Sequence, residues 1–174
     1  MSTATGVRVA LIVFVVAILQ VSAFSSATIR GGGPDVLLVT LISVSLLRGA
    51  VTGAVTGFCA GLIVDVTTLG TLGLTALLLT LVGYWAGRYG ETTGRDRAYA
   101  PLLTTTAATV FVGVGGYAVQ SMLGEVVSAR AVLAALPVAL LWNALLTYPV
   151  FALVRRIVGA PERAQRATEV ELLV

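Results

Sequence analysis

The sequence contains no histidine and no lysine, and its only cysteine is Cys59. A single cysteine excludes an intramolecular disulfide, and without histidine no metal site of thiolates and imidazoles can form. Charged residues are also scarce, at 11% of the chain against about 25% in a typical soluble domain. All eleven basic residues are arginines that flank apolar runs, where such residues anchor helix ends in a membrane. We therefore expect a lipid bilayer as the surroundings and no nucleic-acid partner.

Hydrophobic residues are abundant, at 57% of the 174 residues, and they form long runs without the alternation typical of strands. No water-soluble fold can bury so much apolar surface, and in lipid only helices or closed barrels satisfy the backbone. The predicted fold class is therefore all-α, a polytopic membrane protein with a bundle of about six transmembrane helices. An integral membrane domain over residues 1–160 precedes a cytoplasmic tail over residues 161–174. The predicted spans are residues 7–24, 35–47, 49–66, 72–89, 101–123 and 131–158.

The number of crossings stays open because the second segment is short. Its 13 residues give about 20 Å of helix at a rise of about 1.5 Å each, against a hydrocarbon core of about 30 Å. It either crosses a thinned bilayer, which gives six spans and a cytoplasmic N-terminus, or it re-enters, which gives five. Both arrangements place nine of the eleven arginines on the cytoplasmic side, as the positive-inside rule requires. The C-terminus is cytoplasmic in both.

Glycines recur at every fourth residue of the third segment, at Gly49, Gly53, Gly57 and Gly61. The fourth segment repeats this spacing once. Such rows of small residues let another helix approach the backbone closely, because no side chain projects from them. We expect these glycines to form a helix-packing interface within the bundle, with a transmembrane helix of a partner as the alternative. The second row consists of Gly83 and Gly87.

Two polar residues within the apolar segments are candidates for a role beyond packing. Asp65 follows Gly61 by four residues, and an acid in such a position is a candidate functional group unless it caps the turn that follows. Asn143 lies within the sixth segment and is expected to form hydrogen bonds between helices rather than to bind a ligand. We find no catalytic base next to a nucleophile, no paired acids on one segment and no phosphate-binding loop. The sequence therefore predicts neither an enzyme nor a bound cofactor or metal.

The order of these features resembles the rod shape-determining protein MreD family, small polytopic membrane proteins of the bacterial cell-elongation machinery. A Pro-Asp pair opens a short helix, glycines and a phenylalanine follow, and an aspartate precedes a loop that ends in Leu-Gly. The sixth segment, with Asn143 and a closing pair of arginines, also fits the family. The likeness covers most of residues 8–157. The matched positions are Pro34, Asp35, Gly53, Gly57, Phe58, Gly61, Asp65 and Gly70.

The resemblance implies a non-enzymatic scaffold of the bacterial cytoplasmic membrane that supports cell shape and peptidoglycan synthesis. Its partner would be a bitopic protein like MreC, and through that complex it would reach a glycosyltransferase and a transpeptidase. None of the matched residues is implied to be catalytic. The family fold is similar to the six-helix substrate-binding subunits of vitamin transporters.

That similarity suggests an alternative function, a substrate-binding subunit of a transporter for a small molecule such as a vitamin. Those subunits resemble one another in an Ala-x-x-x-Ala row in the first helix, to which the coupling protein docks. Here the only such spacing joins Ala23 and Ala27, at the outer end of that helix, which counts against transport. A third hypothesis, a flippase for a lipid or a cell-wall precursor, has only Asp65 in its favour.

Overall fold

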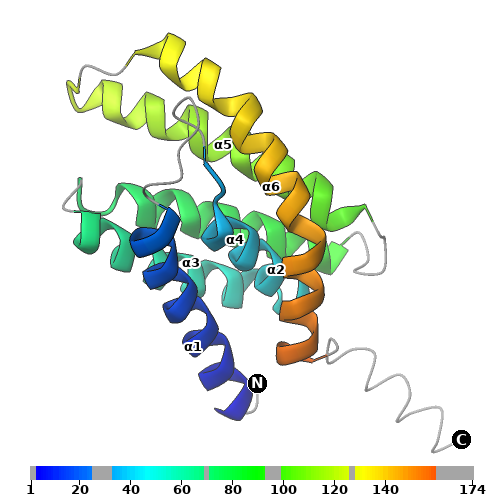
Figure 1. Ribbon diagram of the computed structural model, residues 1–174. Helices are drawn as coiled ribbons and strands as arrows, with labels where there is room; N and C mark the ends of the chain where they lie inside the picture. The colour runs from blue at the N-terminus through cyan, green and yellow to red at the C-terminus, as the bar shows by residue number, and fades with distance from the viewer. Residues whose placement is uncertain (1–2, 25–32, 69–70, 93–98, 126–127, 160–174) are drawn as a thin grey trace, which may run out of the picture.

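The computed structural model describes residues 3–24, 33–68, 71–92, 99–125 and 128–159, and within these ranges the regular elements are all helical. The prediction of an all-α membrane bundle is confirmed, and each predicted apolar segment corresponds to one helix (Figure 1). The helices are α1 (Thr3–Leu19), which continues into the π-helical turn η1 (Gln20–Phe24), α2 (Val36–Arg48), α3 (Ala50–Thr68), α4 (Leu74–Thr92), α5 (Ala100–Met122) and α6 (Ala129–Val158).

The short helix α2 forms the centre of the bundle. Every residue from Leu37 to Leu47 is buried, and α2 contacts all five other α-helices. A helix that is apolar on all sides has no solvent face and must be enclosed, here by protein rather than by lipid. This explains how a helix too short to cross a bilayer alone is accommodated in the bundle (Figure 1).

Two antiparallel helix pairs lie beside α2. Helices α3 and α4 pack along their whole length, whereas α5 and α6 bury only the halves that adjoin the rest of the bundle. The buried residues of α5 end at Thr109, and those of α6 begin at Asn143. The remaining halves form a hairpin that extends beyond the other helices (Figure 1). Among the described residues, α3, α5 and α6 are long and apolar enough to cross a membrane, and shorter apolar stretches lie in α1 and α2.

Charge divides the two ends of the bundle unequally. We call one end arginine-rich: α1, α3 and α5 begin there, and α2, α4 and α6 end there. Its described charges are five arginines and one glutamate, whereas the opposite end carries three acids and one arginine. This asymmetry is typical of a protein oriented by the positive-inside rule. The charges of the arginine-rich end are Arg8, Arg48, Arg88, Glu91, Arg155 and Arg156, and those of the opposite end are Asp35, Asp65, Glu125 and Arg130.

Candidate functional site

The glycines of α3 lie against the backbone of α4. A Cβ atom added at Gly57 would come within 3.0 Å of the carbonyl group of Leu79, and one added at Gly61 would come equally close to the backbone of Ala76. Real Cβ atoms do not approach backbone atoms so closely, so only glycine fits at these positions. The first row of glycines is therefore occupied by a helix of the same chain.

The glycines of α4 complete this interface. Gly53 and Gly83 face each other, since a Cβ atom at either one would meet the carbonyl oxygen of the other. Gly87 lies in the same way against Gly49, whose φ of 96° makes the tight turn between α2 and α3. The structure thus brings together all six glycines singled out in the sequence. Gly90 extends the row towards α2 and was not predicted, because its spacing from Gly87 is three rather than four.

Each helix of the α3–α4 pair carries an acid that caps the other. Near the end of α3, the buried carboxylate of Asp65 accepts hydrogen bonds from the backbone N–H groups of Gly73 (2.9 Å), Thr75 (3.1 Å) and Ala76 (3.2 Å). These groups lie at and just before the start of α4, where the N–H groups have no partners within the helix. Asp65 therefore acts as a cap. The sequence left two interpretations open, a functional acid and a cap of the following turn, and these contacts fit the cap.

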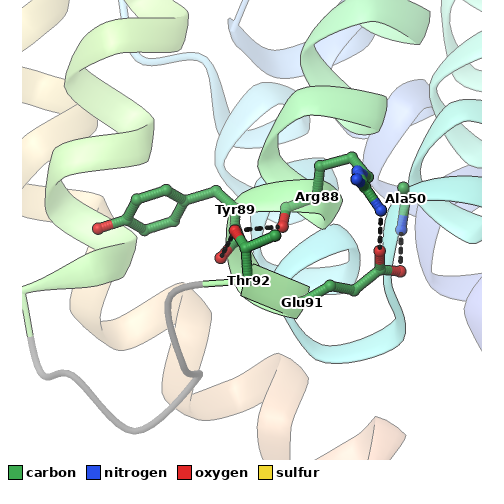
Figure 2. Close-up of polar contacts among 5 residues, drawn as sticks. All are labelled: Ala50, Arg88, Tyr89, Glu91 and Thr92. Carbon is green, nitrogen blue, oxygen red and sulfur yellow. Dashed lines mark hydrogen bonds and ion pairs between the residues drawn. The ribbon is translucent and has the colours of Figure 1, made fainter.

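Glu91 performs the reciprocal role at the arginine-rich end. Figure 2 shows its Oε1 accepting a hydrogen bond of 2.9 Å from the backbone N–H of Ala50, the first residue of α3. Its Oε2 lies 3.5 Å from Nη1 of Arg88, one turn earlier on α4. A carboxylate at a helix N-terminus also complements the positive end of the helix dipole. Both ends of the pair are thus closed by acids of the neighbouring helix.

A polar cluster holds the beginning of α2. Asp35 caps this helix, with its Oδ1 accepting from the backbone N–H of Leu38 at 2.9 Å. The N–H of Asp35 donates to Oδ1 of Asn143 at 2.8 Å, and Nδ2 of Asn143 donates to the hydroxyl of Thr109 at 3.0 Å. Asn143 is almost completely buried. It therefore ties α2, α5 and α6 together at one point, as a hydrogen-bonding residue between helices.

Gln20 completes this cluster from η1 and was missed in the sequence. Its Nε2 donates to the carbonyl oxygen of Pro34 at 3.1 Å, and its Oε1 accepts from the N–H of Val36 at 3.0 Å. The signal that could have found it is a lone amide in an otherwise apolar segment. Such a side chain is stable in hydrocarbon only when its hydrogen bonds are satisfied.

The remaining residues of the predicted motif lie apart from these contacts. Phe58 is half exposed on α3 and faces outward, as Cys59 does. Gly70 and the tail over residues 161–174 lie outside the described residues. Among those that are described, no group of three or more histidine, cysteine, aspartate or glutamate side chains could hold a metal ion.

An apolar groove of about 810 Å³ lies in the surface between α1 and α3, and we call it the α1–α3 groove. One face of α3 lines it with residues at helical spacing, Thr52, Thr56, Cys59 and Ile63. The facing side of α1 contributes small residues together with larger apolar ones. Those of α1 are Gly6, Val7, Val9, Ala10, Leu11, Val13 and Phe14.

A second hollow, of about 380 Å³, lies at the end of the bundle opposite the arginine-rich end. Helices α2 and α4 begin there, and the α5–α6 hairpin extends beyond them. We call it the outer cavity. Apolar residues from α2, α4, α5 and α6 form most of its wall. Its polar side chains come from all four helices and include three members of the cluster that holds α2. These are Asp35, Thr75, Thr109, Tyr117, Gln120 and Asn143.

The chain is similar to a known protein family. The model of a protein family described as rod shape-determining protein MreD matches residues 2–157. No curated protein and no solved structure matches the chain.

Proposed function

Because the chain belongs to the MreD family of rod shape-determining proteins, we propose that it is a non-enzymatic scaffold that binds a single-span partner like MreC. It is a multi-pass membrane protein with a role in rod shape determination. Through its partner it would support peptidoglycan synthesis by a glycosyltransferase and a transpeptidase. The membrane would be the bacterial cytoplasmic membrane, with the arginine-rich end, and so the C-terminus, in the cytoplasm.

The observation that carries this proposal is the α1–α3 groove. Its lining is almost entirely apolar, which fits a helix of a partner and does not fit a polar substrate. Small residues on both walls, such as Gly6, Ala10 and Cys59, allow a second backbone to come close. The hydroxyl of Thr56 donates to the carbonyl oxygen of Thr52 at 2.7 Å, so it adds little polarity to the groove. The glycine rows of α3 and α4, by contrast, already pack against each other.

Filling the groove is expected to weaken the complex. Ala10 is exposed and lines the groove, whereas Ala134 is exposed on α6 outside it. We expect Ala10→Trp to lower recovery of a co-expressed MreC-like partner about tenfold, because a bulky side chain takes the space of the partner helix. The measurement is co-purification from detergent-solubilised membranes, with the amount of each protein determined separately.

The matched control is Ala134→Trp, which adds the same side chain to a lipid-facing surface. Its partner recovery should stay within about twofold of the unmodified chain, since lone exposed substitutions have small effects. Equal losses for the two variants, or no loss for Ala10→Trp, would show that the partner does not bind in the α1–α3 groove.

The alternative function, a substrate-binding subunit of a vitamin transporter, is favoured by one observation, the outer cavity. Its volume of about 380 Å³ lies at the small end of the range for ligand pockets, about 300–1,000 Å³. We expect no saturable binding of riboflavin or biotin, neither of which carries a cationic amine, by the purified chain in equilibrium dialysis. Saturable binding of either vitamin would make transport the better assignment.

A further inference from the structure

The outer cavity combines a hydrogen-bonded floor with polar groups that have no partner. Asn143 at the floor is fixed by its bonds to Asp35 and Thr109. Asp35 uses only Oδ1, for the cap on Leu38, and its Oδ2 accepts no hydrogen bond from the described part of the chain. The hydroxyl of Tyr117 and the side-chain amide of Gln120 also have no partner there.

A packing defect does not explain these features. Cavities that stay empty are lined by apolar groups. A cavity that holds a water-sized polar molecule instead offers it about two to four polar partners in the wall. Gly116 of α5 also leaves the space open, because a Cβ atom there would meet only a terminal methyl group of Leu78, at 3.7 Å. At Gly116 the wall could therefore hold a larger residue without a clash. The outer cavity is thus an open space with unsatisfied hydrogen-bonding groups.

The charge of the cavity defines what can bind. Among the described residues that line it, Asp35 is the only charged one. The other acids at this end are engaged elsewhere, since Asp65 caps α4 and Glu125 accepts from the hydroxyl of Thr71 at 3.1 Å. Arg130 is exposed and does not line the cavity. An ionised carboxylate in such surroundings is costly unless a positive charge accompanies it.

One carboxylate is too few for a metal ion, because calcium and magnesium take six or more oxygen ligands and favour several anionic ones. We propose that the outer cavity binds a protonated amine. The ammonium group would lie at Oδ2 of Asp35, with the amide of Gln120 and the hydroxyl of Tyr117 as further acceptors. The apolar part of the ligand would lie against Leu38, Leu78 and Leu136, which line the same space.

Two sources could supply this amine: the headgroup of phosphatidylethanolamine or a soluble amine. For the first, the full chain is reconstituted with mixed phosphatidylethanolamine and phosphatidylcholine, and retained lipids are counted by native mass spectrometry. For the second, n-butylamine is titrated into the chain in phosphatidylglycerol nanodiscs by isothermal calorimetry. Selective phosphatidylethanolamine retention identifies a lipid headgroup, and saturable butylamine binding identifies a water-accessible site. Either result is expected under the proposal.

The deciding variant is Asp35→Asn, which removes the charge but keeps an oxygen to cap α2. We expect it to weaken amine binding about tenfold or more, as loss of a hydrogen bond to a charged group does. The control Glu125→Gln removes a carboxylate at the same end outside the cavity and should leave binding unchanged. If Asp35→Asn does not fold, Gly116→Leu, which fills the space without touching Asp35, takes its place.

The proposal is overturned if butylamine does not bind saturably and phosphatidylethanolamine is retained no better than phosphatidylcholine. It is equally overturned if the deciding variant binds as the unmodified chain does, or if Glu125→Gln weakens binding to the same degree. None of these measurements involves the α1–α3 groove, so their failure leaves the proposed partner binding to be judged by its own experiment.

Discussion

Replacing Gly57 by alanine is expected to destabilise the purified chain by about 3 kcal/mol, and replacing it by leucine to prevent folding. The added Cβ atom would overlap the carbonyl group of Leu79, which belongs to a helix backbone and cannot move alone. Overpacking of this kind typically costs about 1–3 kcal/mol, and backbone contact places it at the upper end. For a chain of this size the loss corresponds to a fall in Tm of about 10 °C, measurable by thermal unfolding in detergent.

The matched control is Gly116→Ala, the same substitution on α5. Here the nearest atom to the added Cβ is 3.7 Å away, an ordinary contact. Alanine is favoured over glycine within a helix by about 0.5–1 kcal/mol, so this variant should be slightly more stable. Opposite signs for the two substitutions are therefore the expected pattern. Similar effects at Gly57 and Gly116 would mean that α3 and α4 do not pack through their glycines.

The glycine spacing shows what the sequence can and cannot predict. A row of glycines at every fourth position indicates a close helix contact, because the spacing and the missing side chains are properties of one helix. The row does not specify which helix fills it, so Gly57 could have faced a partner protein. The structure brings α4 to this face, and the rows on the two helices then match. The partner surface is consequently proposed elsewhere, in a groove that has no glycine pattern.

Helix α2 illustrates the same division between local and long-range information. Its extent was predictable from composition, since an apolar run begins after Pro34 and ends at Gly49. Its central position was not, because burial on every side depends on where five other helices lie. The 13-residue length left open whether this helix crosses a thinned bilayer or re-enters. Enclosure by protein provides the physical reason why so short a helix is stable here.

The polar contacts were the least predictable features. Local capping patterns place the acceptor within three residues of the N–H group that it binds. Glu91 instead reaches an N–H group 41 residues earlier in the chain, and Asn143 reaches one 108 residues earlier. No periodicity carries such information. What the sequence does show is that these side chains are polar within apolar surroundings, which identifies them as groups that need a partner.

Replacing Asp65 by alanine is expected to destabilise the chain by about 3 kcal/mol or more. Three backbone N–H groups at the start of α4 would lose their acceptor, and each buried unsatisfied donor costs about 1–3 kcal/mol, partly relieved by water at the helix end. Thermal unfolding should show a fall in Tm of about 10 °C. Glu125→Ala is the control, because this exposed acid accepts a single hydrogen bond from a side chain and its loss should cost less than about 1 kcal/mol.

Asp65→Asn separates capping from acid chemistry at the same position. The amide keeps one oxygen to accept from the first turn of α4 but places an NH₂ group against the remaining donors, so we expect an intermediate loss of stability. Rod shape in a complemented cell should then follow stability, with Asp65→Ala the more severe variant. The capping role would be contradicted if Asp65→Asn left the Tm unchanged but did not support rod shape. The carboxylate would then serve chemistry that no cap requires.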